Sequence, residues 1–457
     1  MAVATAAPPV HVRRQPGTVD LATLVRRWPQ RYPCLLASTC RGGVRTRWDL
    51  LLAHPQQRIE LRADGGLHGA ADTAADTFLT ALDAAFERSR CADDDSDLPF
   101  VGGWALYLGY ELAAAIEPRL RLPQAPTART PCALALRCPA AVLVDHQRQQ
   151  TVLLAEPEQA HLLDAMAADL TQAAGYLPAA TLPPLQLREP APARYREGVR
   201  RIHEYLQAGD VFQVNLAHAW RGSFEHEPEP AALFAALREA NPAPFAGLLQ
   251  QPGWALVSSS PERLLAVRGG RVEARPIAGT CPRGDGASDA ALRSDLLLHP
   301  KERAEHIMLV DLVRNDLGRI SVPGSVRVDE LMTLESYAHV HHIVSNVSGR
   351  LRAGVTPGDT IAAVFPGGTI TGCPKVRCME IIAELEGAPR GAYTGALGYL
   401  DRRGALDLNI LIRTLALEGA ALSLHAGAGI VIDSVPEREL AETHAKARGL
   451  LRALGVA

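Results

Sequence analysis

Residues 395–432 read GALGYLDRRGALDLNILIRTLALEGAALSLHAGAGIVI, and this stretch decides the fold. Three apolar runs, at 395–400, 408–415 and 422–432, follow one another with only short polar breaks between them. Short apolar runs bounded by glycine and polar residues are typical of strands. No helical segment separates them, so the crossover helix of a parallel βαβ unit is missing. The stretch therefore predicts consecutive, mainly antiparallel strands.

The rest of the chain adds strands and helices that do not alternate strictly. We expect helices at 76–90, 195–208, 300–317, 376–385 and 437–454, strands at 99–110, 211–217 and 254–258, and a hairpin of 142–145 with 151–154. The prediction is a mixed α/β fold of the α+β type with large, mainly antiparallel sheets. Five prolines in 177–194 mark a linker. It would divide an N-terminal region, 1–180, from a catalytic domain, 190–457.

The composition indicates a globular protein and excludes several function classes. Of 457 residues, 47% are hydrophobic and 21% charged, with a net charge of −3 and no basic run interleaved with aromatics. A nucleic-acid binder is therefore not expected. No apolar stretch approaches the roughly 20 residues of a membrane span, and the N-terminus has no signal-peptide pattern. Eight cysteines without zinc spacing suggest reduced thiols and a cytoplasmic location.

Two pairs of acidic residues could hold a metal ion. Glu302 and Glu305 lie in KERAEH, and Glu439 and Glu442 lie in PERELAE, each pair spaced i,i+3. That spacing puts both carboxylates of a pair on one helix face. If folding brought the pairs together, they would offer oxygen ligands to a hard cation such as Mg²⁺. Taken alone, such a pair is more typical of a solvated helix face.

Three further side chains have both a structural and a functional interpretation. Lys446 extends the stripe of Glu439 and Glu442, where it could form a surface ion pair or bind an anion. Arg413 lies within an apolar run, so its guanidinium needs an internal ion pair or a substrate carboxylate. Strand alternation separates His342 from its neighbour His341. This favours a single histidine for proton transfer over a histidine metal cluster.

Two glycine-rich segments could bring backbone N–H groups close to a ligand. Gly427 and Gly429 flank one alanine just before an apolar run, although most such pairs mark only a tight packing point. Residues 367–375, GGTITGCPK, include Thr371 and Gly372 and lead into a predicted helix. Its N–H groups could point at an anion, or the segment could be a plain strand-to-helix turn. The spacing is not that of a Walker A loop.

Many ordered motifs together resemble those of the chorismate-utilising enzymes. This family includes anthranilate synthase component I, aminodeoxychorismate synthase component I, isochorismate synthase and salicylate synthase. The motifs span most of the chain and are SPER at 260–263, PIAGT at 276–280, KERAEH at 301–306, LVRNDLGR at 312–319, GTITGCPKVRCMEII at 368–382, IRT at 412–414, GAGIV at 427–431 and the stripe of Glu439, Glu442 and Lys446.

The resemblance implies a fold and a set of roles. Two large antiparallel sheets would pack together, with helices outside and the active site between them, as in anthranilate synthase component I. Mg²⁺ would sit on Glu305 and Glu442, supported by Glu302 and Glu439. The substrate carboxylates would be bound by Arg413, Tyr393, Lys446 and the backbone of 427–429. Thr371 and Gly372 would also bind the substrate. Glu262 would match the general acid that helps the C4 hydroxyl of chorismate to leave, a role that requires a raised pKa.

Single positions indicate which member of the family the chain resembles. Gln213 stands where members that use water as the nucleophile have a lysine base, which points to ammonia supplied by a glutamine amidotransferase subunit (component II). Ala278 departs from the PIKGT lysine that forms a covalent adduct in many aminodeoxychorismate synthases. Asn215, in QVNL, and PGGTITG at 366–372 nevertheless resemble that branch. Ala37, in LLAS at 35–38, stands where the LLES of feedback-regulated anthranilate synthases has its glutamate, and the loss of that glutamate argues against inhibition by tryptophan.

The predicted reaction is amination of chorismate at C4, giving 4-amino-4-deoxychorismate for 4-aminobenzoate and folate synthesis. The alternative is amination at C2 with loss of pyruvate, giving anthranilate, in which His342 would assist proton removal. A non-catalytic chorismate-binding regulator is a third possibility, and the presence of the acids, Arg413 and Lys446 counts against it.

Overall fold

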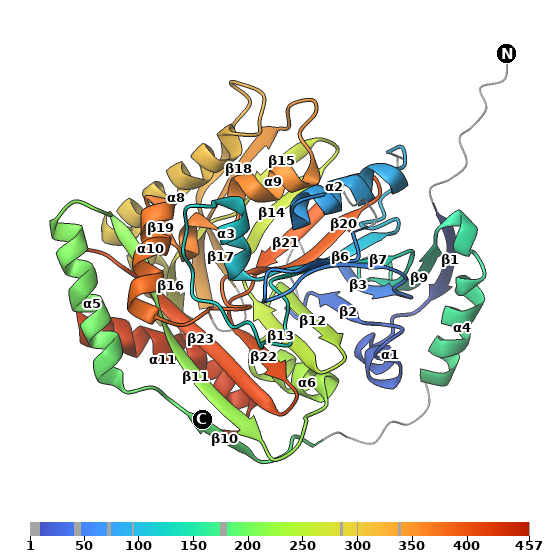
Figure 1. The fold of residues 1–457 in the computed structure, drawn as a ribbon, viewed down its shortest axis with the longest axis horizontal. Helices are drawn as coiled ribbons and strands as arrows, with labels where there is room; N and C mark the ends of the chain where they lie inside the picture. Colours follow the sequence, from blue (N-terminus) through green and yellow to red (C-terminus); the bar gives the residue numbers. More distant parts are fainter. Residues whose placement is uncertain are drawn as a thin grey trace.

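Two large antiparallel sheets lie face to face in the computed structural model (Figure 1). The structure describes residues 10–40, 47–70, 75–93, 96–173, 181–283, 287–298, 300–336 and 340–456. Within these residues every strand pair is antiparallel. The predicted fold class is confirmed.

The first sheet has 12 strands and includes the first and the last strand of the described chain. Its order is β1 (His11–Pro16), β9 (Gln150–Ala155), β8 (Ala140–Asp145), β3 (Trp48–Ala53), β2 (Cys34–Ala37), β12 (Phe245–Gln251), β13 (Trp254–Ser260), β22 (Thr414–Glu418), β23 (Ala421–Ile430), β11 (Gln213–Phe224) and β10 (Leu185–Arg188), with β19 (Gly372–Cys373) paired to β11.

The second sheet has 11 strands. Its order is β16 (Ile277–Pro282), β18 (Val340–Arg350), β15 (Arg271–Ala274), β14 (Arg263–Arg268), β21 (Leu406–Ile410), β20 (Ala396–Asp401), β6 (Gly103–Leu108), β7 (Ala133–Cys138), β4 (Arg58–Leu61) and β5 (Leu67–His68), with β17 (Arg327–Ser336) paired to β18.

Helices cover the outer faces of both sheets. They are α1 (Ala22–Arg27), α2 (Phe78–Ser89), α3 (Ala113–Ile116), α4 (Leu162–Ala173), α5 (Pro192–Gln207), α6 (Pro230–Ala240), α7 (Ala287–Leu298), α8 (Pro300–Gly318), α9 (Pro357–Val364), α10 (Lys375–Glu386) and α11 (Pro436–Ala453). The helices expected at 76–90, 300–317, 376–385 and 437–454 are confirmed.

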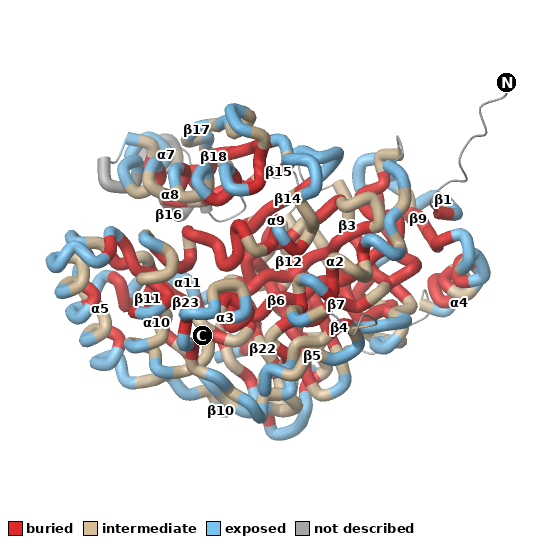
Figure 2. Tube along the Cα trace, turned by 45° about the horizontal axis from the view of Figure 1, so that its top comes forward, coloured by how far each residue is buried: buried red, intermediate tan, exposed pale blue. Residues whose placement is uncertain are grey.

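Three apolar layers hold the helices and sheets together. Leu143 and Leu256 of the first sheet pack against Tyr107 and Leu397 of the second, so the two inner faces form a shared core. A second cluster joins α1, α4, α6 and α11 to the outer face of the first sheet, and a third joins α2, α8 and α9 to the second. Figure 2 shows the resulting buried interior beneath an exposed shell. Burying both faces of each sheet in this way is the main stabilising contribution to the fold.

The single strand predicted across 408–415 is interrupted in the structure. β21 ends at Ile410 in the second sheet, and β22 begins at Thr414 in the first. Arg413 lies between them with φ of 52°, in the left-handed region that a strand residue does not adopt. The expectation of a continuous strand is therefore wrong, because apolar character cannot reveal that the chain changes sheets.

The proline-rich segment is only partly a connection. Leu185–Arg188 forms β10 and pairs with β11, and α5 already begins at Pro192. Residues 174–180 are outside the described part of the chain. Both sheets take strands from either side of this segment, and a division into 1–180 and 190–457 stays a prediction. None of the described helices combines the length and hydropathy of a membrane span.

The close pairing of β20 with β21 depends on Gly398. A Cβ atom at this position would lie 1.9 Å from the carbonyl oxygen of Asp407 in the neighbouring strand. We expect Gly398→Ala to lower the free energy of unfolding by roughly 1–3 kcal/mol or more, since backbone in a central strand cannot move aside. Urea unfolding measures this. Gly318→Ala, where a Cβ would meet nothing within 4 Å, is the control and should not be destabilising.

Candidate functional site

The chain crosses between the two sheets twice at the same place. β13 of the first sheet continues through Pro261 and Glu262 into β14 of the second, and β21 continues through 411–413 into β22. The crossings bind each other, because the Ser259 N–H donates to the Arg413 carbonyl at 3.1 Å and the Ile410 N–H to the Glu262 carbonyl at 3.0 Å. Glu262 and Arg413 therefore lie side by side between the sheets.

Glu262 is a buried carboxyl group that holds its proton near neutral pH. Burial raises its pKa from the ordinary value of 4.5 to about 7. A hydrogen bond of 3.0 Å from the Thr369 hydroxyl to Glu262 Oε1, and the positive charges of Lys446 and Arg413, oppose that rise without cancelling it. Desolvation is therefore the dominant effect. Such a group can deliver a proton to a leaving hydroxyl at neutral pH.

Arg413 presents a guanidinium that no described carboxylate pairs with. Burial lowers its pKa, and the charge of Glu262 partly offsets this. The sequence left open an internal ion pair or a ligand carboxylate. Within the described residues no ion pair to Arg413 is formed, which leaves the guanidinium available to an anion. The sequence predicts Arg413 within a strand, and the structure corrects this, because Arg413 lies at a crossing between the two sheets.

The Gln213 side chain, on β11, forms a hydrogen bond to a side chain of α8 next to a glycine. Its Nε2 donates to Glu305 Oε1 at 3.1 Å, and the Gln213 side chain is buried. A Cβ atom at Gly429 would lie 2.1 Å from that Nε2 and 3.5 Å from Glu305 Oε1, so a side chain there would displace the Gln213 amide. Gln213 Oε1 and Asn215 Oδ1, on the same face of β11, are buried without a hydrogen-bond partner among the described residues. Both can accept a hydrogen bond from a ligand.

The second glycine position brings a tyrosine and a lysine to β23. A Cβ atom at Gly427 would lie 2.6 Å from the Tyr393 hydroxyl. Lys446 Nζ donates to the Gly427 carbonyl at 2.9 Å and pairs with Glu442 Oε1 at 2.7 Å. Helix α11 thus places a cation and a carboxylate next to the same strand that passes Gln213 and Glu305.

The four acids have the donor chemistry of a magnesium site. Glu305 extends from α8, while Glu439 is buried and Glu442 exposed on α11. The Glu302 side chain lies outside the described residues. Carboxylate oxygens are the ligands that Mg²⁺ prefers, and acids from two helices can supply several of them. These residues therefore fit the ion. Among the described side chains, the three acids do not form a group with ligand atoms within 4.8 Å of one another.

His342 is a neutral histidine on β18. Burial, together with the neighbouring positive charge of Arg413, lowers its pKa to about 3. It therefore lies close to the crossing that carries Arg413, as a weak base. Its neighbour His341 is bound to Ser336 and Asp289, and residue 339 is outside the described part of the chain.

Thr371 and Gly372 support the strand of Gln213 rather than offering side chains to the site. The Thr371 hydroxyl donates to the Gly367 carbonyl at 2.9 Å. Gly372 has φ of 126°, and a Cβ there would lie 2.1 Å from the Gln213 carbonyl oxygen. Contact of these residues with substrate stays a prediction.

Sequence reasoning missed two residues that bind the site residues, Thr369 and Arg390. Thr369 lies in the conspicuous glycine-rich segment, but its bond to Glu262 spans 107 positions. Arg390 is buried and donates to the Asn215 carbonyl at 2.8 Å and to Glu386. Arg390 lies beyond the end of α10 at Glu386, so helical spacing does not indicate its contact with Glu386.

Comparison with known proteins places these residues in one family. A family model of chorismate binding enzymes matches residues 32–452. An anthranilate synthase component I-like protein from Synechocystis is 44% identical over 78% of this chain and 73% of its own length. Aminodeoxychorismate synthase component 1 from Bacillus subtilis is 50% identical over 57% of this chain and 55% of its own. The crystal structure of anthranilate synthase component I from Streptococcus pneumoniae has a TM-score of 0.79, with 32% identity over 90% of this chain and 93% of that one.

The raised pKa of Glu262 predicts a pH-dependent loss of stability. The folded protein keeps this proton up to about pH 7, whereas the unfolded chain releases it near 4.5. The free energy of unfolding should therefore decrease as pH rises through that window, by roughly 3 kcal/mol. Glu262→Gln stays neutral and should be more stable than the unsubstituted protein at pH 8 but not at pH 4. Urea unfolding at both pH values measures this.

The exposed Glu225→Gln variant is the control for that measurement. It should follow the unsubstituted protein at both pH values. An equal difference between Glu262→Gln and the unsubstituted protein at pH 4 and pH 8 would contradict the assignment of a proton to Glu262.

Proposed function

Because the chain belongs to the family of chorismate binding enzymes, we propose that it replaces the C4 hydroxyl of chorismate by an amino group. Chorismate and ammonia would give 4-amino-4-deoxychorismate and water, a product for 4-aminobenzoate and folate synthesis. The C–O bond at C4 breaks, a C–N bond forms at the same carbon, and the pyruvyl group stays on the ring.

The observation that carries this proposal is the buried, hydrogen-bonded side-chain amide of Gln213. Its amide is buried and bound to Glu305, and an amide cannot take a proton from water. Ammonia is already nucleophilic and needs no base. The unpartnered oxygens of Gln213 and Asn215 suit a nucleophile that brings its own N–H donors.

The other residues have roles that follow from their charges. Glu262 donates its proton to the leaving hydroxyl, and the released water carries that oxygen away. Arg413, Lys446, the Tyr393 hydroxyl and the backbone of 427–429 bind the two carboxylates of chorismate. Mg²⁺, held by Glu305 and Glu442 with Glu302 and Glu439 in support, would neutralise one of these carboxylates when bound.

The choice of C4 over C2 is supported by His342. Anthranilate formation requires loss of a ring proton, and a histidine whose pKa is lowered to about 3 is a poor base for it. Amination at C4 without elimination needs no such step. Anthranilate synthesis remains the second candidate, because Ala278 cannot form the covalent adduct that a lysine would, and one similar relative is an anthranilate synthase component I-like protein.

Ammonia would come from a glutamine amidotransferase subunit. The relative from Bacillus subtilis is named as component 1 of its enzyme, which supports a second component for this chain too. We place the complex in the cytoplasm, in keeping with cysteines that are all free among the described residues.

Incubation with chorismate, Mg²⁺ and an ammonium salt should distinguish the products. We expect 4-amino-4-deoxychorismate, which gives 4-aminobenzoate only after a separate lyase is added. Chromatographic separation with fluorescence detection measures both outcomes. Fluorescent anthranilate without added lyase would overturn the proposal in favour of the second candidate, and no turnover would favour a non-catalytic regulator.

Removing one carboxylate from the proposed metal site should abolish Mg²⁺-dependent turnover. Glu305→Gln and Glu442→Gln keep the shape of the side chain but remove its charge, so the ion loses a charged ligand. Rates measured over a Mg²⁺ titration should fall at least about 100-fold in each variant. Glu437→Gln, an exposed position on the same helix, is the matched control and should behave like the unsubstituted enzyme. Unchanged rates in both variants would refute the metal assignment.

A further inference from the structure

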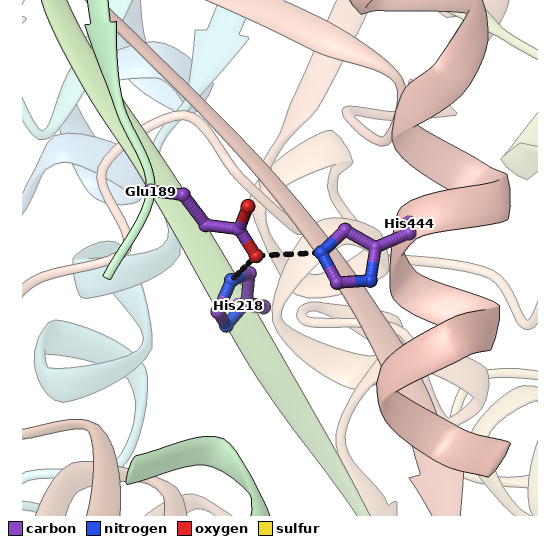
Figure 3. Close-up of side chains that lie close together, drawn as sticks. All are labelled: Glu189, His218 and His444. Atoms are coloured by element: carbon purple, nitrogen blue, oxygen red, sulfur yellow. Dashed lines mark hydrogen bonds and ion pairs between the residues drawn. The ribbon is translucent and has the colours of Figure 1, made fainter. Parts of the chain in front are cut away.

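We propose that Glu189, His218 and His444 form a second metal site, for a transition-metal ion such as Zn²⁺ (Figure 3). Glu189 follows β10, His218 lies on β11 and His444 on α11. Their ligand atoms all lie within 4.8 Å of one another. The inference does not depend on the proposed function.

This site is separate from the one that carries Gln213. His218 is five residues further along β11, and alternation puts its side chain on the opposite face of the strand. On α11, His444 is two residues from both Glu442 and Lys446, which turns it about 200° away from each of them. The two sites therefore lie on opposite sides of the same strand and of the same helix.

The two imidazoles converge on a single oxygen atom. Glu189 Oε1 lies 2.9 Å from His218 Nε2 and 2.5 Å from His444 Nε2. Because a carboxylate only accepts hydrogen bonds, both ring nitrogens are the donors here. In tetrahedral zinc sites with bonds of 2.0–2.1 Å, ligand atoms are about 3.3 Å apart. A small outward movement would let one ion take the place of the two bridging protons.

Neighbouring aromatic rings hold both histidines in position. The His218 ring is buried and meets Tyr195 edge-on at 5.7 Å and Trp220 at 4.6 Å. The His444 ring lies 5.8 Å from Trp220. Packing of this kind fixes the directions of the ligand nitrogens before an ion arrives.

The chemistry of the ligands selects the class of ion. Two imidazole nitrogens and one carboxylate suit Zn²⁺, Ni²⁺, Co²⁺ or Cu²⁺, whereas Mg²⁺ prefers oxygen alone. The side chains of Glu189 and His444 are 35% and 40% exposed, so water can reach the remaining coordination position. A bound ion would fasten the segment between β10 and α5 to the helix that carries Glu439, Glu442 and Lys446.

Zinc binding to the full chain tests this proposal. Chelator-treated, dialysed protein should bind one equivalent of Zn²⁺ in a calorimetric titration. Loss of a contact that only supports a metal ligand weakens binding roughly 10- to 100-fold, and His444→Ala, which removes a ligand, should weaken it by more. His444→Gln, which keeps an amide N–H for Glu189 but no imidazole, is the second variant. His226→Ala removes an exposed histidine whose Nδ1 lies 3.4 Å from the carbonyl oxygen of the adjacent Glu227, and should leave binding unchanged.

Trp220 supplies an independent signal. Ni²⁺ at this site should quench the fluorescence emission of Trp220. The quenching should be lost in both His444→Gln and Trp220→Phe. Trp220→Phe should still bind Zn²⁺. Circular dichroism confirms that each variant is folded. Absence of Zn²⁺ binding by the unsubstituted chain, or equal Zn²⁺ affinity and Ni²⁺ quenching in His444→Gln, would overturn the proposal and leave an ordinary hydrogen-bonded cluster.

Discussion

Two chain crossings between the sheets, bound to each other, are the constraint on which the site depends. The hydrogen bonds from Ser259 to Arg413 and from Ile410 to Glu262 tie the crossings at backbone level. Each crossing must leave its sheet, and Arg413 adopts a left-handed conformation to do so. An acid and a cation therefore meet in the core at a place where neither sheet has a regular strand. The surrounding apolar layers make that placement rigid.

Burial then decides the chemistry of these groups. Glu262 has two cations and a hydroxyl donor nearby, and each of them favours its ionised form. Its pKa is nevertheless raised, because the cost of desolvating the carboxylate exceeds their combined effect. The same desolvation keeps His342 neutral, with Arg413 acting in the same direction. Burial in the protein interior, rather than residue type alone, therefore keeps Glu262 protonated and His342 neutral.

In the proposed function, the choice of product depends on a few residues within a framework that the family shares. The acids, Arg413 and Lys446 belong to the part of the chain that matches chorismate binding enzymes in general. Gln213 and Ala278 bear on the nucleophile and on the covalent route, and similar relatives carry the names of both activities. Helix α11 adds a different property, because His444 turns away from Glu442 towards His218 and Glu189. One helix thus serves two clusters of side chains on opposite faces.

The sequence by itself determined the antiparallel class, the main helices and the resemblance to the family, because periodicity and ordered motifs are local properties. It also identified Glu262, Gln213 and Arg413, but as separate residues. Only the tertiary structure decided that Arg413 lies at a sheet crossing, that Thr369 binds Glu262 and that Gln213 binds Glu305. The same holds for the cluster of Glu189, His218 and His444, in which His218 and His444 are 29 and 255 positions from Glu189. Contacts between residues so far apart in the sequence depend on the order of the strands in a sheet. Local sequence patterns do not determine that order.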